Sequence, residues 1–156
     1  MALPIGTPAP DFTLFSDERN PVTLSECKGQ PVVLLFFPLA FTSVCTTELC
    51  AVRDTMATYN ELQARVFGIS VDTPQTLARF REEQRLNFNL LSDFNKEASR
   101  AYGCIYEQFG MNMRGVSKRG AFVIDKDGIV RHAEVLENAG ELPDFGTLVA
   151  VLRTLE

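Results

Sequence analysis

An unbroken apolar run, PVVLLFF at residues 31–37, constrains the fold more than any other stretch of the sequence. A strand with one face in water alternates apolar and polar residues, whereas a continuous apolar run is typical of a strand buried on both faces. Such a strand needs other elements packed against each side. A chain of 156 residues is long enough to supply them around one core. We therefore predict a single domain over residues 1–156 with a buried sheet at its centre.

Short strands and helices alternate along the rest of the chain. The predicted order is a hairpin over 12–15 and 22–24, a strand over 31–37, a helix from about 43, a strand over 65–72, a helix over 73–85, a strand over 89–93, a short helix over 96–102, a hairpin over 120–125 and 129–135, and a closing helix over 144–155. Thr73 and Pro74 mark the second helix as its N-cap and first residue. This order predicts an α/β fold, with a central mixed β-sheet flanked by helices and an N-terminal β-hairpin extension.

The helix that follows the buried strand begins near Ser43. Leu49, Val52, Met56 and Tyr59 recur at helical spacing and form an apolar stripe for its inner side. The pattern predicts one helix that carries all four residues.

Charge and composition exclude several classes of protein. The net charge is −5 and the sequence has no run of Lys or Arg, which argues against a partner that is a nucleic acid or an anionic membrane. The N-terminus lacks the pattern of a secretory signal, and the longest apolar run is too short to span a membrane. We therefore expect a cytoplasmic protein, in which thiols are kept reduced. Cysteines in such a chain are catalytic, metal-binding or simply buried, and a single His cannot build a usual zinc site.

Cys45 lies where the first helix is predicted to start. A cysteine in the first helical turn sits among unpaired backbone N–H groups at the positive end of the helix dipole, which favours the reactive thiolate. The alternative is a small buried apolar residue, since free cysteine is among the most buried residue types. Pro38 fixes the backbone as it leaves the strand, and Thr42 offers a hydroxyl close to the thiol.

Three blocks of the sequence resemble one family. Residues 38–45, PLAFTSVC, match the P-x-x-x-T-x-x-C signature of the peroxiredoxins, the AhpC/TSA superfamily. Residues 6–12, GTPAPDF, are similar to the family's G-x-x-A-P-D-F segment, and residues 119–125, RGAFVID, resemble its R-x-x-F-V-I-D strand. The blocks occur in order over nearly the whole chain. The C-x4-C spacing of Cys45 and Cys50 resembles the PrxQ, or bacterioferritin-comigratory, branch, whereas the residues around it, FFPLAFTS and ELCAVRD, look closer to the AhpE branch.

The resemblance implies a thioredoxin-like fold and the reduction of hydrogen peroxide and organic hydroperoxides without a metal or organic cofactor. It assigns Cys45 as the peroxidatic cysteine, which becomes a sulfenic acid. It implies that Thr42 hydrogen-bonds the peroxide, that Arg119 holds the thiolate and polarises the O–O bond, and that Pro38 shields the pocket. Glu48 matches a glutamate that helps orient the arginine in many members. Its alternative role is that of an ordinary acidic residue in the first helical turn.

Cys50 is the main candidate to resolve the sulfenic acid as an intramolecular disulfide. Residues five apart on an α-helix differ by about 140° in direction and about 7.5 Å in rise, which is too far for a disulfide. We therefore expect the first turns to unwind before Cys45 and Cys50 can bond. The alternatives are a buried Cys50 that takes no part, resolution by Cys27 or Cys104, or an external thiol.

The reductant implied by the resemblance is a thioredoxin-like protein. A one-cysteine cycle with another thiol reductant, or a peroxide-sensing relay that passes its oxidation to a partner protein, remain alternatives. The sequence contains no C-x-x-C pair, which argues against a thioredoxin-type disulfide reductase. Either a monomer or a homodimer fits the sequence.

Overall fold

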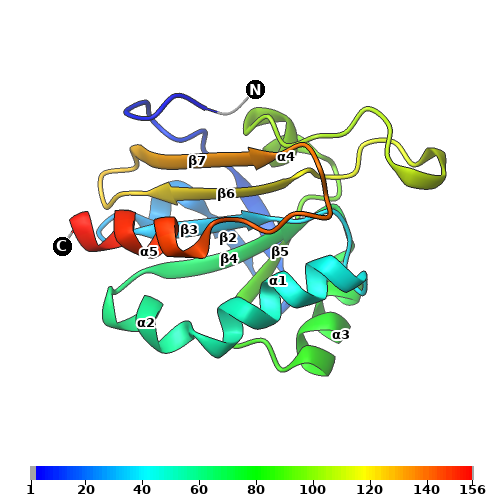
Figure 1. Cartoon of the computed structure of the whole chain (residues 1–156), viewed down its shortest axis with the longest axis horizontal. Helices are drawn as coiled ribbons and strands as arrows, with labels where there is room; N and C mark the ends of the chain where they lie inside the picture. Colours follow the sequence, from blue (N-terminus) through cyan, green and yellow to red (C-terminus); the bar gives the residue numbers. More distant parts are fainter. Residues whose placement is uncertain (1–2, 156) are drawn as a thin grey trace.

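A seven-stranded sheet forms the centre of the molecule (Figure 1). The computed structural model describes residues 3–155. The strands are β1 (Thr13–Ser16), β2 (Pro21–Thr23), β3 (Val32–Phe36), β4 (Arg65–Ser70), β5 (Asn89–Ser92), β6 (Arg119–Ile124) and β7 (Val130–Leu136). The helices are α1 (Ser43–Asp54), α2 (Met56–Glu61), α3 (Pro74–Gln84), α4 (Glu97–Ala101) and α5 (Phe145–Thr154), with short 3-10 turns η1 (Leu24–Cys27) and η2 (Gly110–Asn112).

The sheet is mixed, as the sequence predicts. Its strand order is β2-β1-β5-β4-β3-β6-β7. The strands β3, β4 and β5 run parallel, whereas β6 is antiparallel to both β3 and β7. The predicted N-terminal hairpin forms from β1 and β2 and joins the sheet through antiparallel pairing of β1 with β5.

The two faces of β3 enter two separate apolar cores. Val33, Leu35 and the adjacent Phe37 pack with residues of α1, α2, α3 and α5. The alternate residues of β3 pack on the other face with residues of η1 and α4. Because successive side chains of a strand point to opposite faces, the unbroken apolar run places one set of side chains in each core.

The predicted first helix is interrupted, and one helix becomes two. Thr55, with φ of −115° and ψ of 17°, separates α1 from α2. Its hydroxyl donates to the Ala51 carbonyl oxygen at 3.0 Å, so it competes with the helical backbone ladder at this position. The four residues of the predicted stripe are nevertheless all buried on the α1 side of the sheet: Leu49, Val52, Met56 and Tyr59.

The starts of the later helices agree with the sequence. Thr73 accepts a hydrogen bond from the Thr76 backbone N–H at 3.2 Å and caps α3, with Pro74 at its first position. Asp144 caps α5 in the same way by accepting from the Thr147 backbone N–H at 3.1 Å. Within residues 3–155, no helix has the length and apolar character that crossing a membrane would require.

The segment between α4 and β6 projects from one end of the sheet and carries η2 near its tip (Figure 1). Its two arms pair with each other through hydrogen bonds between the backbones of Tyr106, Gly115 and Val116. We call residues 105–118 the projecting segment. It lies beside the end of the sheet at which α1 begins.

Candidate active site

A short loop turns the chain from β3 into α1. The Ala40 backbone N–H donates to Oδ2 of Asp72 at 2.8 Å, which ties the loop to the end of β4. Phe41 follows with φ of 66°, in the left-handed region, and its ring lies 5.1 Å from that of Phe80 on α3. Thr42 then returns to an extended conformation as the N-cap of α1. These two contacts fix where the first turn of α1 begins, and therefore where Cys45 lies.

Cys45 is buried in the first turn of α1, with 1% of its surface exposed. The Thr42 hydroxyl donates to the Leu39 carbonyl oxygen at 2.8 Å and does not cap the helix. The first N–H groups of a helix have no partner within it, so they face the region of the thiol with a positive partial charge. The predicted position of Cys45 at the start of the helix is confirmed.

Arg119 connects Cys45 with two other groups. It is the first residue of β6 and is 1% exposed. Its Nη2 donates to Sγ of Cys45 at 3.3 Å, and its Nη1 donates to Oε1 of Glu48 at 2.6 Å. Its Nε and Nη2 both donate to the carbonyl oxygen of Ala139, at 3.3 and 2.9 Å. Four hydrogen bonds on a planar, five-donor group leave its orientation little freedom.

Glu48 is fully buried one helical turn after Cys45. Burial raises the pKa of its carboxyl group from 4.5 to about 7, although the charge and hydrogen bond of Arg119 act in the opposite direction. Its second oxygen, Oε2, is buried without a hydrogen-bond partner among the described residues. Burial lowers the pKa of Arg119, but Glu48 and Cys45 raise it by more, so the guanidinium remains charged.

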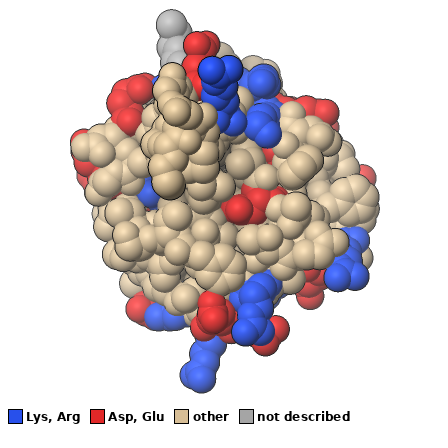
Figure 2. Space-filling model, turned by 90° about the vertical axis from the view of Figure 1, so that its right-hand side faces the viewer, with Lys and Arg blue, Asp and Glu red and all other residues tan. Residues whose placement is uncertain are grey.

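An open pocket of about 230 Å³ gives access to the thiol. Its wall consists of Pro38, Thr42, Ser43, Val44, Cys45, Phe109, Arg119, Ala139 and Gly140. Figure 2 views the molecule from the side at which α1 begins, and uncharged residues make up most of the centre of this face, with Lys and Arg gathered toward its edges. The cationic group that this pocket offers to a ligand is Arg119.

Cys50 lies on the same side of the sheet as Cys45 but is directed elsewhere. It is half-buried against the α1-side core, and its Sγ donates to Oε1 of Gln84 at 3.5 Å. Gln84 is the last residue of α3. The helix between the two cysteines is continuous, so the expected separation by direction and rise applies.

Cys27 and Cys104 both lie in the core on the opposite side of the sheet. Burial raises the pKa of Cys104 to about 12 and that of Cys27 above its ordinary value, although Arg65 lowers the latter in part. Both thiols therefore stay protonated near neutral pH. Sγ of Cys104 fills the space beside Gly120, where an added Cβ would lie 2.6 Å from it.

The structure brings four of the predicted site residues to one pocket: Pro38, Thr42, Cys45 and Arg119. Glu48 joins them through Arg119, whereas Cys50 does not reach the pocket. Sequence reasoning missed Ala139, because its contribution is a backbone carbonyl that no side chain signals. It also missed Asp72, whose carboxylate accepts the Ala40 N–H from 32 positions along the chain.

The chain matches known proteins over most of its length. The AhpC/TSA family matches residues 5–133. Alkyl hydroperoxide reductase E of Mycobacterium tuberculosis is 39% identical over 145 residues, which cover 91% of each protein. Peroxiredoxin Bcp of Escherichia coli is 37% identical over 132 residues, covering 83% of this chain and 84% of that protein.

The fold of the chain also matches solved structures. The crystal structure of peroxidoxin BcpB from Mycobacterium tuberculosis superimposes with a TM-score of 0.85 and 31% identity, and 97% of each chain is covered. The thioredoxin-like fold with a mixed sheet is therefore confirmed. On this evidence, the chain belongs to the AhpC/TSA family, the peroxiredoxins, and is a thiol-dependent peroxidase.

Proposed function

We propose that Cys45 attacks the hydroperoxide and that Arg119, Thr42 and Pro38 assist it. The observation that carries this proposal is the hydrogen bond of Arg119 to a buried thiol at the wall of an open pocket. The thiolate sulfur attacks the terminal oxygen of R–O–OH, a new S–O bond forms and the O–O bond breaks. The products are the Cys45 sulfenic acid and the alkoxide, which takes a proton to become the alcohol. Sulfur is oxidised, and the peroxide is reduced by two electrons.

Ionisation of the thiol alone does not explain a fast reaction. An ordinary thiol with a pKa of about 8.5 is already about 3% thiolate at pH 7, so complete ionisation gains at most about 30-fold, or about 2 kcal/mol. Further acceleration needs groups that bind the transition state better than the ground state. Negative charge moves from sulfur to the leaving oxygen, and in this proposal the Arg119 guanidinium stabilises it, joined by the Thr42 hydroxyl once that hydroxyl turns away from the Leu39 carbonyl oxygen. Because Glu48 and Ala139 restrain the guanidinium, little reorganisation is needed.

Cys50 is the resolving cysteine in this proposal. Its thiol attacks the sulfur of the Cys45 sulfenic acid, the S–O bond breaks, and a disulfide and water form. Its position supports this role, because it shares the α1 side of the sheet with Cys45, whereas Cys27 and Cys104 lie behind the sheet with raised pKa values. The first turns of α1 must unwind for the two sulfurs to meet. A thioredoxin-like dithiol protein then reduces the disulfide, in a cytosolic setting.

A one-cysteine cycle is the second candidate, and one contact favours it. Sγ of Cys50 is directed at Gln84 on α3 rather than at Cys45. In that cycle an external thiol attacks the Cys45 sulfenic acid, and Cys50 stays reduced.

Mass spectrometry after oxidation tests the proposal. We expect one equivalent of hydrogen peroxide to remove two hydrogens from the protein, with peptide mapping that locates a Cys45–Cys50 cross-link. A Cys45→Ser variant should show no peroxide turnover, and retained turnover would remove the central claim. A lasting dimedone adduct on Cys45 in the wild type, with Cys50 free, would replace the two-cysteine cycle by the one-cysteine cycle.

A further inference from the structure

Both polar and apolar side chains line the pocket, and the apolar ones point to a residue that selects the substrate. Thr42, Cys45 and Arg119 supply polar groups, beside which the –OOH group must lie. Pro38, Val44 and Phe109 contribute the apolar wall. We propose that Phe109 determines specificity, by packing against the organic group of a hydroperoxide R–OOH and favouring bulky apolar R groups over hydrogen peroxide. This inference rests on the proposed attack by Cys45.

The size of the pocket supports a substrate larger than hydrogen peroxide. Hydrogen peroxide has two heavy atoms and fills about the space of two water molecules, each of which takes about 30 Å³ in the liquid. The pocket of about 230 Å³ leaves most of its volume beyond the –OOH group. A group that fills this volume against carbon-rich side chains gains by leaving water. Hydrogen peroxide has no such group and gains nothing from that wall.

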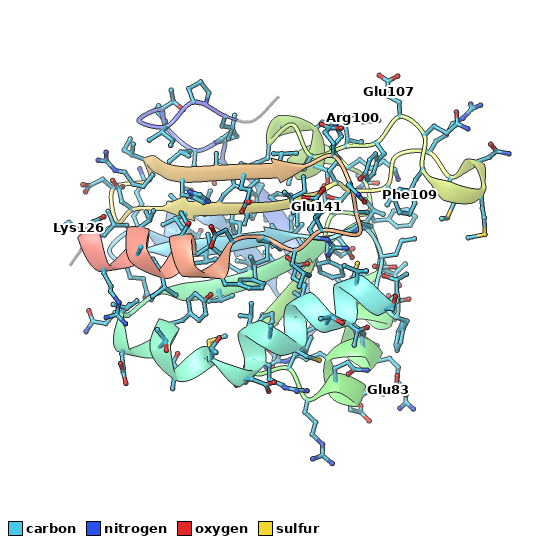
Figure 3. All side chains as sticks on the ribbon, viewed as in Figure 1. Glu83, Arg100, Glu107, Phe109, Lys126 and Glu141 are labelled. Atoms are coloured by element: carbon cyan, nitrogen blue, oxygen red, sulfur yellow. The ribbon has the colours of Figure 1, made fainter. Side chains whose placement is uncertain are left out.

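Phe109 is held in place before the substrate arrives. Its backbone N–H donates to the Met113 carbonyl oxygen at 2.7 Å within the projecting segment. Its ring packs on that of Tyr106, with centroids 5.0 Å apart and planes inclined by 37°. Phe109 immediately precedes η2 in the projecting segment, and Figure 3 shows it beyond the end of the sheet on the side at which α1 begins. A ring fixed in this way offers a preformed surface to a ligand, which reduces the entropy lost on binding.

The loop that follows β7 contacts both Arg119 and the projecting segment that carries Phe109. In this loop, the Glu137 carbonyl oxygen accepts a hydrogen bond from the Tyr106 hydroxyl at 2.8 Å, and the Glu137 carboxylate lies 2.8 Å from Nζ of Lys118. Two residues later, the Ala139 carbonyl oxygen accepts two N–H groups of Arg119. The loop therefore fixes the distance between the ring that faces the organic group and the guanidinium that faces the peroxide. A hydroperoxide must span that distance to use both.

Rates with two peroxides test the role of Phe109. The second-order rate constant for Cys45 oxidation is measured with hydrogen peroxide and with cumene hydroperoxide, in the wild type and in Phe109→Ala, Phe109→Leu and Met111→Ala. We expect Phe109→Ala to lower the cumene hydroperoxide rate about tenfold and to change the hydrogen peroxide rate less than about twofold. Phe109→Leu, which keeps an apolar side chain, should retain most of the cumene hydroperoxide rate.

Met111→Ala is the matched control, because Met111 is in the same segment, is 89% exposed and does not line the pocket. It should leave both rates unchanged. An equal loss with both peroxides in Phe109→Ala, or no loss with either, would overturn the specificity role while leaving the proposed reaction intact. A wild-type protein whose Cys45 reacts with neither peroxide would overturn the proposed function itself.

Discussion

At the scale of single residues, Glu48 has two carboxylate oxygens in different surroundings. Oε1 accepts a short hydrogen bond from Arg119, whereas Oε2 is buried and lacks a partner among the described residues. A buried polar atom without a partner raises the cost of the charged form of its group. The direction of the pKa shift follows from this arrangement, because burial outweighs the attraction of the guanidinium.

The raised pKa of Glu48 has a consequence for stability. Between pH 4.5 and about 7, the folded protein holds a proton on Glu48 that the unfolded chain has released. The contribution is therefore fully present below pH 4.5 and is lost as the pH rises through about 7. We expect Glu48→Gln to remove this pH-dependent loss of stability, which is roughly 3 kcal/mol at about 1.4 kcal/mol for each pKa unit, while its amide oxygen still accepts from Arg119.

Urea unfolding at a series of pH values measures this effect. Glu83→Gln is the matched control, since Glu83 is exposed on α3 and points away from the molecule in Figure 3. It should follow the wild-type pH dependence. A Glu48→Gln profile parallel to that of the wild type would show that Glu48 does not hold the proton.

At the scale of the elements, α1 is a short helix with a defined end. It stops at Asp54, and the interruption at Thr55 separates it from α2. The resolving step that we propose needs the turns between Cys45 and Cys50 to open. Because α2 is a separate element, α1 can open while the second helix stays in place.

Hydrogen exchange tests whether α1 opens on oxidation. We expect the amides of residues 46–50 to exchange more than about tenfold faster in the peroxide-treated protein than in the reduced one, since local opening exposes them to water. The amides of α2, over Met56–Glu61, should not change and serve as the internal control. In Cys50→Ser, which cannot form the disulfide, residues 46–50 should stay protected. Faster exchange in that variant as well would separate the opening from disulfide formation.

Sequence reasoning reached the site by different routes, and its misses have physical reasons. The unbroken apolar run predicts the central strand, because only a strand buried on both faces needs one. The family resemblance predicts the roles of Arg119 and Glu48. The sequence did not predict the break between α1 and α2 at Thr55, because the helical spacing of apolar residues continues across it. Ala139 escaped because one backbone carbonyl is like any other in a sequence. The Cys50–Gln84 contact depends on how α1 packs against α3, which local patterns do not specify.

At the scale of the whole molecule, one sheet separates Cys45 from two buried thiols whose pKa values are raised. Cys45 and Cys50 lie on one side, and Cys27 and Cys104 lie in the core behind it. Gly120, next to Arg119 in β6, has Sγ of Cys104 in the space where a side chain would be. The core behind the sheet therefore packs directly against the strand that carries Arg119.

A double-mutant cycle tests this packing. We expect Gly120→Ala to destabilise the protein by about 1–3 kcal/mol, because the new methyl group overlaps Sγ of Cys104. Combining it with Cys104→Ala should recover the part of that loss due to Sγ, while the close approaches to Phe122 and to the Glu134 carbonyl oxygen remain, as denaturant midpoints would record. Simple additivity of the two changes would contradict the contact.

We also propose that residues 1–156 unfold as one domain, so each variant should show a single transition that fluorescence and circular dichroism report together.

The left-handed backbone conformation of Phe41 affects how easily the start of α1 unwinds. A bulky residue at φ of 66° is conformationally strained, at a cost of order 1–3 kcal/mol, and the Phe80 ring and the Asp72–Ala40 hydrogen bond hold the loop in that shape. Any movement that unwinds the start of α1 frees Phe41 to return to an ordinary conformation. The folded loop thus stores energy that is released when it opens, and the opened form is correspondingly easier to reach. The turn that sets the position of Cys45 in the folded protein therefore also lowers the free energy needed to unwind the start of α1.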